Sequence, residues 1–125
     1  MCAPITSQYG AIEALKDGFT DNFATVEEMR DSYDKRRKFV LHSLQEIGLH
    51  CFEPRGAFYA FPSVKNTGLT AETFADGLLK TEKVAVVPGN AFGTFGTYNV
   101  RLSYATSMQA LDEAFTRMQA FLSKL

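Results

Sequence analysis

The residue with the clearest capacity for chemistry is Arg101, in the run YNVRLSY at residues 98–104. Apolar and polar residues alternate through this run, which predicts a strand with Arg101 on its polar face. A guanidinium is planar and permanently charged, and its paired N–H donors match the two oxygens of a carboxylate. Held on a strand beside a loop of small residues, it would make a rigid carboxylate-binding fork. Periodicity alone favours the simpler interpretation, an arginine exposed on a half-buried strand.

The glycine-rich loop PGNAFGTFG at residues 88–96 raises the possibility of a phosphate site. It fits neither the dinucleotide-binding pattern GxGxxG nor the P-loop, because no lysine and serine or threonine follow at the required spacing. A connection between two strands is the favoured interpretation.

Three further side chains with reactive or metal-binding chemistry are His42, His50 and Cys51. No additional ligands follow at zinc-like spacing, and no third group would orient a nucleophile and its base. Ordinary surface or core roles are therefore favoured. The charged run YDKRRK at residues 33–38 predicts a solvated helix face, with local pairs to acids such as Asp31 or Asp34.

The elements that would position Arg101 can be read from periodicity and stop signals. In chain order they are a helix from Ile5 with a stop at Gly18, a linker over residues 17–24, a long helix capped by Thr25 and ended by Gly48, an aromatic strand over 56–61, a helix capped by Thr70, an interior strand over 84–87, the strand of Arg101, and a helix from about Ser107. This order predicts an α+β fold, with a small mixed or antiparallel sheet of three to five strands covered by helices.

Composition limits the classes of function. The chain has 125 residues, enough for one domain, and a formal net charge of −1, so neither a nucleic-acid nor an anionic-membrane partner is expected. No apolar run approaches the length of a membrane span, and the opening MCAPITSQYG lacks the charged start and long apolar stretch that would predict a signal peptide. Cys2 and Cys51 are expected to be free thiols, and the cytoplasm is the expected location.

Four runs occur in a fixed order and spacing: GAFYAFP at 56–62, VAVVPG at 84–89, AFG at 91–93 and VRLSYA at 100–105. In these runs the chain resembles the C-terminal part of class I/II, fold type I aminotransferases, which use pyridoxal 5'-phosphate. The opening APITSQYGAIEALKDG at 3–18 resembles the segment that leaves the large domain of that family and starts its interdomain helix. The resemblance extends over essentially all of the chain.

This resemblance implies two parts, an interdomain helix and linker at 1–24 and the aminotransferase small domain at 25–125. It implies that Arg101 binds the α-carboxylate of an amino-acid or 2-oxo-acid substrate. The cofactor lysine and the other cofactor ligands of the family precede this region, so no catalytic, cofactor-binding or metal-binding residue is expected here. The chain alone is predicted to be inactive and to hold no pyridoxal phosphate. Its implied partners are the missing large domain and, for the parent enzyme, a second copy in a homodimer.

Two other interpretations remain open. The chain could be a free-standing binding or interaction module derived from an aminotransferase. It could also be a self-associating form, whose apolar face pairs with itself instead of with the missing domain. The resemblance does not predict which amino acid the parent enzyme uses.

Overall fold

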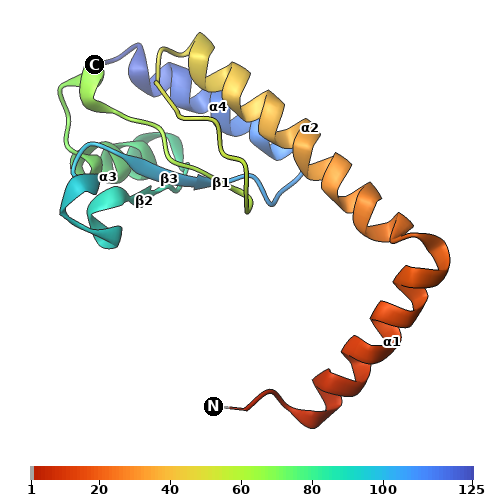
Figure 1. Cartoon of the computed structure of the whole chain (residues 1–125). Helices are drawn as coiled ribbons and strands as arrows, with labels where there is room; N and C mark the ends of the chain where they lie inside the picture. The colour runs from red at the N-terminus through yellow and green to blue at the C-terminus, as the bar shows by residue number, and fades with distance from the viewer. Residues whose placement is uncertain (1) are drawn as a thin grey trace. The chain divides into compact units, whose positions relative to one another are not determined.

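The computed structural model describes residues 2–125, which form two compact units, one ending at Asp34 and the other spanning Lys35–Leu125 (Figure 1). The elements are α1 (Ile5–Asp21), α2 (Ala24–Glu46), β1 (Tyr59–Ala60), α3 (Ala71–Glu82), β2 (Val87–Pro88), β3 (Val100–Ser103) and α4 (Met108–Leu122), with short 3-10 turns at Lys65–Thr67, Gly89–Phe92 and Thr94–Gly96. The α+β class is confirmed. The assignment of 1–24 as an interdomain helix and 25–125 as a small domain remains a prediction.

The turn between α1 and α2 is tighter than the predicted linker of residues 17–24. Helix α1 continues to Asp21, and Asn22 and Phe23 then adopt left-handed backbone angles, with φ of 58° and 57°. Gly18 does not end the helix. A Cβ on Gly18 would lie 2.4 Å from Cε1 of Phe23, so the missing side chain makes room for the Phe23 ring. The glycine serves packing at this turn instead of terminating the helix.

The helical spacing of Ile5, Tyr9, Ile12 and Leu15 predicted helix α1, and all four side chains are exposed. Phe19, which follows the predicted stop at Gly18, is exposed as well. Among the described residues, no helix is both long and apolar enough to cross a membrane.

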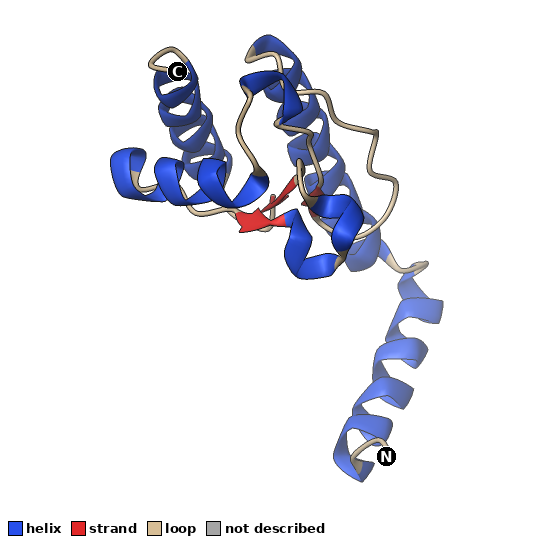
Figure 2. Cartoon of the chain, turned by 90° about the vertical axis from the view of Figure 1, so that its left-hand side faces the viewer, coloured by secondary structure: helices blue, strands red, loops and turns tan. Residues whose placement is uncertain are grey.

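The second unit is built on a three-stranded antiparallel sheet with the order β1-β3-β2, so β3 is the central strand (Figure 2). The pairing of β1 with β3 places Tyr59 opposite Ser103. Backbone hydrogen bonds continue it in both directions, from Tyr104 N–H to the Phe58 carbonyl (2.9 Å) and from Val100 N–H to the Pro62 carbonyl (3.1 Å).

The prediction of an interior strand over residues 84–87 was wrong in extent and in position. Only Val87 and Pro88 pair with β3, and β2 is an edge of the sheet. Pro88 lacks an N–H group and cannot donate to a ladder, which limits the strand at its C-terminal end. In the predicted strand, Val84, Val86 and Val87 are half-buried and Ala85 is exposed, which agrees with an edge position and not with an interior strand.

Helices cover one face of this sheet. The second half of α2 runs beside α4, and the rings of Phe39 and Phe115 meet edge to face at 6.0 Å (Figure 1). Helix α3 packs on α4 through Phe74 and Phe121, at 5.4 Å. The fully buried side chains beneath these helices include Val40, Leu44, Leu49, Val64, Phe74, Leu78, Val100 and Tyr104.

The predicted cap of α3 at Thr70 is confirmed, and Ser107 caps α4, the helix that was expected to begin near this residue. The Thr73 N–H donates to the Thr70 hydroxyl at the start of α3, at 3.3 Å, and the Ala110 N–H donates to the Ser107 hydroxyl at the start of α4, at 3.1 Å. Such caps satisfy backbone donors that have no partner within the helix.

Candidate functional site

Strand β3 places Arg101 on the sheet face opposite the helices. Burial alternates along the strand: Val100 and Leu102 are buried, whereas Arg101 is half-buried and Ser103 exposed. Because side chains alternate between the two faces of a strand, the buried residues anchor β3 to the core and direct Arg101 away from it. Arg101 lies opposite Val87 of β2, so its backbone is held in the middle of the sheet.

Two aromatic rings flank the Arg101 guanidinium. Its Cζ lies 4.5 Å from the ring centroid of Tyr59 and 4.5 Å from that of Phe92. Tyr59 belongs to β1 and Phe92 to the turn after β2, so the rings come from the elements on either side of β3. Both distances fall within the range of cation–π attraction.

No acid neutralises this arginine within residues 2–125. The guanidinium has neither an ion pair nor a hydrogen bond there; its contacts are the two rings. Arg30, Arg37, Arg55 and Arg117, by contrast, each pair with a glutamate or aspartate. Among residues 2–125, therefore, no carboxylate occupies the N–H donors of Arg101.

The glycine-rich loop holds Phe92 beside the arginine through a close backbone crossing. A Cβ on Gly89 would lie 2.5 Å from the carbonyl oxygens of Asn99 and Gly96, and a Cβ on Gly96 would lie 2.1 Å from the Gly89 oxygen. The Gly89 N–H donates to the Asn99 carbonyl (2.7 Å), and the Asn99 N–H donates to the Gly96 carbonyl (3.0 Å). Both glycines are needed because two backbones meet there.

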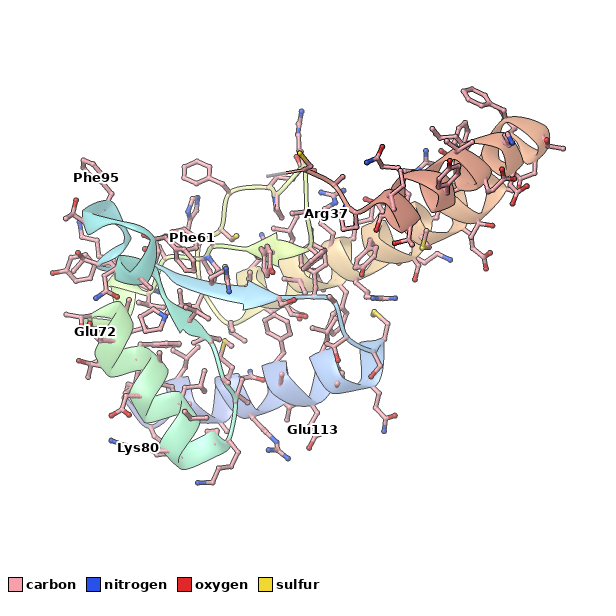
Figure 3. The ribbon with its side chains drawn as sticks, turned by 90° about the horizontal axis from the view of Figure 1, so that it is seen from below. Arg37, Phe61, Glu72, Lys80, Phe95 and Glu113 are labelled. Carbon is pink, nitrogen blue, oxygen red and sulfur yellow. The ribbon has the colours of Figure 1, made fainter. Side chains whose placement is uncertain are left out.

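The loop does not form a phosphate cradle. The N–H groups of Gly89, Gly93 and Gly96 all donate to backbone carbonyls of the chain itself, at 2.7 to 3.2 Å. An anion would have to displace those bonds. Within the loop, the Asn90 side-chain amide donates to Glu72 of α3 at 2.5 Å, which ties the turn Gly89–Phe92 to that helix. Figure 3 shows Glu72 on α3 and Phe95 projecting outward from the loop.

The remaining candidates from the sequence have ordinary roles. His42 lies 3.4 Å from Glu46, one turn along α2, and the His50 ring contacts Phe52. Cys51 is a free, partly buried thiol, and burial raises its pKa above the usual value. Within residues 2–125, no group of three histidine, cysteine or acidic side chains could hold a metal ion.

The charged run at residues 33–38 also reaches beyond its own helix. Arg37 pairs with Glu53 at 2.6 Å, and Glu53 in turn accepts from Arg55 at 3.3 Å. The sequence predicted only local pairs for this run. The pair of Arg37 with Glu53 joins residues sixteen positions apart, and the residues around Arg37 give no indication of it.

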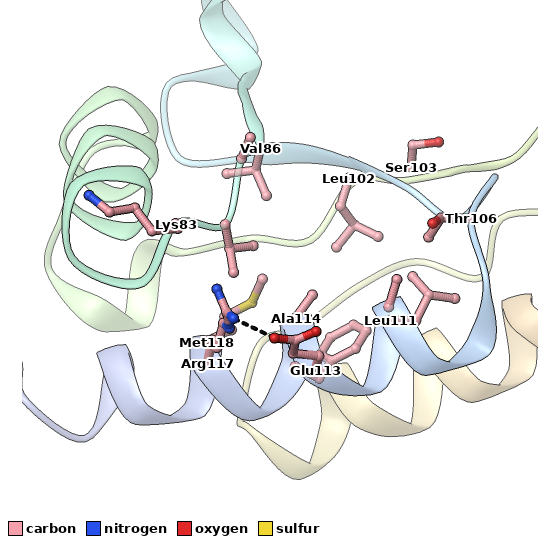
Figure 4. Close-up of a pocket in the computed structure, with 14 residues that line it drawn as sticks. Lys83, Val86, Leu102, Ser103, Thr106, Leu111, Glu113, Ala114, Arg117 and Met118 are labelled. Atoms are coloured by element: carbon pink, nitrogen blue, oxygen red, sulfur yellow. Dashed lines mark hydrogen bonds and ion pairs between the residues drawn. The ribbon is translucent and has the colours of Figure 1, made fainter.

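A cavity of about 340 Å³ lies on the other face of β3, against α4 (Figure 4). Its lining is largely apolar, with Leu102, Leu111 and Met118, and the ion pair of Arg117 with Glu113 lies at its edge. Arg101 does not line it. The cavity and the candidate site are therefore separate features.

No lysine of the chain has the surroundings of a cofactor-binding lysine. All seven, at positions 16, 35, 38, 65, 80, 83 and 124, are exposed. Lys16, Lys80 and Lys124 form ion pairs with surface acids, and the Lys83 ammonium donates to a backbone carbonyl. A catalytic lysine amine usually needs a desolvated or positively charged environment to lower its pKa. The described residues therefore do not fit pyridoxal phosphate by themselves.

Sequence reasoning identified Arg101 but assigned no role to Tyr59 or Phe92. Both lie in runs that were singled out, GAFYAFP and AFG. Alternation could have placed Tyr59 and Arg101 on exposed strand faces, but the pairing of the strands could not be read from the sequence. No local signal places Phe92 beside Arg101.

Comparison with known proteins identifies the family. The family model "Aminotransferase class I and II" matches residues 1–118. The aspartate aminotransferase of Pyrococcus abyssi is 50% identical over 120 residues, which are 95% of this chain and 30% of that protein. Aromatic-amino-acid aminotransferase 2 of Thermococcus litoralis is 46% identical over 122 residues, 97% of this chain and 31% of that protein.

The solved structures agree with the sequence relatives. The crystal structure of the aromatic aminotransferase from Pyrococcus horikoshii matches with a TM-score of 0.87 and 50% identity, over 94% of this chain and 31% of that one. The chain spans 30% to 31% of the length of the first curated relatives that it matches.

Proposed function

The chain belongs to the class I and II aminotransferases, and on this premise we propose that it forms the C-terminal domain of a pyridoxal-phosphate enzyme. That enzyme exchanges an amino group between an amino acid and a 2-oxo acid. In this proposal Arg101 binds the α-carboxylate of the substrate. The large domain that binds the cofactor, and a second copy of the whole chain in a homodimer, are its partners.

The observation that carries the proposal is the state of the Arg101 guanidinium. It is fixed on the central strand, half-buried, flanked by rings, and unpaired with any acid of residues 2–125. An uncompensated half-buried charge costs free energy unless something else satisfies it. A substrate carboxylate supplies two oxygens in the geometry that the guanidinium matches.

The chemical task of Arg101 is to bind and orient. Two parallel N–H···O bonds fix both the position and the plane of the carboxylate, and hence the direction in which the α-carbon points. Small errors in such positioning can lower reaction rates by large factors. Arg101 moves no proton.

Pyridoxal phosphate supplies the electron sink on which amino-group exchange depends. Since no lysine here fits that cofactor, we expect the purified 125-residue chain to show no transamination. The measurement is conversion of an amino acid to its 2-oxo acid with added pyridoxal phosphate. Conversion above the level given by free cofactor would overturn the expectation.

The test of Arg101 uses the full-length enzyme that carries this chain. Replacing it by Arg101→Lys exchanges a two-pronged donor for a point charge, so the KM for the amino acid should rise and kcat should fall. Because a hydrogen bond to a charged group contributes roughly 1.5–3 kcal/mol, kcat/KM should drop about ten- to hundredfold. Arg55→Lys is the matched control, because Arg55 is exposed and pairs only with Glu53. Unchanged kinetics for Arg101→Lys would refute the proposed role.

A separate observation distinguishes this proposal from a free-standing module. The reading frame upstream of the segment should encode a large domain with a cofactor lysine. A stop codon there, together with natural expression at 125 residues, would favour the module instead.

A further inference from the structure

On the basis of that proposed function, we infer that Tyr59 and Phe92 are positioning residues that hold the Arg101 guanidinium for its carboxylate. The two rings clamp the cation without using its N–H donors. They replace the acidic partner that usually orients an arginine in a protein.

The first support is the equivalence of the two contacts. Each ring centroid lies 4.5 Å from Cζ of Arg101, although the rings come from different elements. Tyr59 faces Ser103 across the β1–β3 pair, so it lies diagonally from Arg101 on the same sheet face. Phe92 approaches from the side of β2, at the end of the turn Gly89–Phe92.

The second support is that each ring is itself held in place. The Tyr59 ring contacts Phe58 at 4.7 Å. The Phe92 ring meets Phe61 edge to face at 6.3 Å, and its turn is fixed by the crossing of Gly89 and Gly96. A ring that is free to rotate away could not restrict the guanidinium, whereas these rings have neighbours that restrict them.

The third support comes from what an acid would do in the same place. A carboxylate beside Arg101 would orient the guanidinium, but it would occupy the donors that a substrate needs. An aromatic ring attracts a cation through its face and leaves the N–H groups at the edge of the guanidinium available. The described residues follow this division: rings contact Arg101, and acids contact Arg30, Arg37, Arg55 and Arg117.

The test measures carboxylate binding at Arg101 directly in the 125-residue chain. With arginine labelled by ¹⁵N, the Nε–H signal of Arg101 is assigned by its loss in Arg101→Gln and is then followed as sodium acetate is added at constant ionic strength. Acetamide, which has a similar shape and no charge, is the ligand control. Acetate should shift the signal with a saturable curve, and acetamide should not.

The ring variants are Tyr59→Leu and Phe92→Leu. Each should weaken acetate binding about two- to fivefold, the range expected for loss of one exposed cation–π contact. Each should also move the Arg101 Nε–H signal before any acetate is added, because the ring current is lost. Tyr59→Phe keeps the ring and should bind acetate as the unmodified chain does, and Tyr59→Trp should bind it at least as well.

Phe95→Leu is the matched control, because Phe95 is fully exposed in the same loop and contacts no other ring among the described residues. It should leave both the signal and the affinity unchanged. Tyr59 and Phe92 are 36% and 53% exposed, so their replacement should preserve the fold, and unchanged backbone amide spectra would verify this.

The outcomes separate the two proposals. If acetate shifts no signal of Arg101, the role of Arg101 as a carboxylate site fails, and the positioning role fails with it. If acetate binds at Arg101 with the same affinity in Tyr59→Leu and Phe92→Leu, only the positioning role fails. A loss in both leucine variants with recovery in Tyr59→Phe supports the positioning role, because a merely structural effect would not follow the presence of a ring.

Discussion

Replacing Gly96 by alanine tests whether the backbone crossing in the glycine-rich loop is as close as the structure shows. The new Cβ would lie 2.1 Å from the oxygen of Gly89, 2.2 Å from its carbonyl carbon and 2.9 Å from the nitrogen of Asn90. A carbon atom approaches a carbonyl oxygen to no less than about 3.3 Å even in favourable contacts. The two backbone segments must therefore separate by about 1 Å.

The cost can be worked from these contacts. All three neighbouring atoms belong to the backbone, so no side chain can rotate aside, and the hydrogen bonds that join Gly89 to Asn99 and Asn99 to Gly96 must stretch. Overpacking typically costs 1–3 kcal/mol, and a backbone clash belongs at the upper end, about 3 kcal/mol. That is a large fraction of the roughly 5–15 kcal/mol that stabilises a typical domain.

The assay is urea denaturation followed by circular dichroism. With an m-value of about 1.5 kcal/mol/M, a loss of 3 kcal/mol lowers the urea midpoint by about 2 M. Gly56→Ala is the control, because a Cβ there has no neighbour within 4 Å and the backbone is not left-handed. It should change the free energy of unfolding by less than about 0.5 kcal/mol. If Gly96→Ala unfolds at the same urea concentration as Gly56→Ala, the close crossing is refuted.

Two further predictions concern ionisable groups. Arg37, followed by Arg55, lowers the pKa of Glu53, so this carboxylate stabilises the fold above its unfolded pKa of about 4.3 and loses that effect as pH falls through the lower folded pKa. The urea midpoints of the unmodified chain and Glu53→Gln should therefore converge at low pH, and a difference that persists at pH 2 would contradict this assignment. Burial raises the pKa of Cys51, so at pH 8 a disulfide reagent should modify it several-fold more slowly than the exposed Cys2. Rates measured on Cys2→Ser and Cys51→Ser provide the comparison, and equal rates would show that Cys51 is as accessible as Cys2.

The helices were predictable from local signals. The expected long helix corresponds to α2 at Ala24–Glu46, and it ends just before Gly48 as predicted. The prediction of Thr25 as its N-cap was wrong, because the helix begins one residue earlier, directly after the left-handed turn at Asn22 and Phe23. A 3.6-residue repeat acts within a few positions, so the sequence alone reveals the body of the helix better than its first residue.

The strands were harder to predict because their extent depends on partners far along the chain. The aromatic run at residues 56–61 becomes a strand only at Tyr59 and Ala60. Ala57 adopts a left-handed φ of 55°, and its carbonyl accepts from the hydroxyl of Tyr104, 47 positions away, at 3.1 Å. Nothing near Ala57 in the sequence indicates that contact.

The candidate site was predictable in part. Resemblance to the aminotransferases identified Arg101, whereas alternation alone favoured an ordinary exposed arginine. The structure adds the absence of an acidic partner within residues 2–125 and the presence of two rings. These features arise from strand pairing and from a loop crossing, both of which bring distant residues together.

The uncompensated charge on β3 also bears on how the chain would respond to selection for heat resistance. Selecting variants only by melting temperature would favour replacing Arg101 with an apolar residue, which removes the unpaired charge, or placing a glutamate beside it, which pairs with that charge. In the proposed function, either change would also prevent Arg101 from binding a substrate carboxylate. At this one position of β3, thermal stability and the proposed carboxylate binding therefore favour different residues. The chain carries the residue that suits binding.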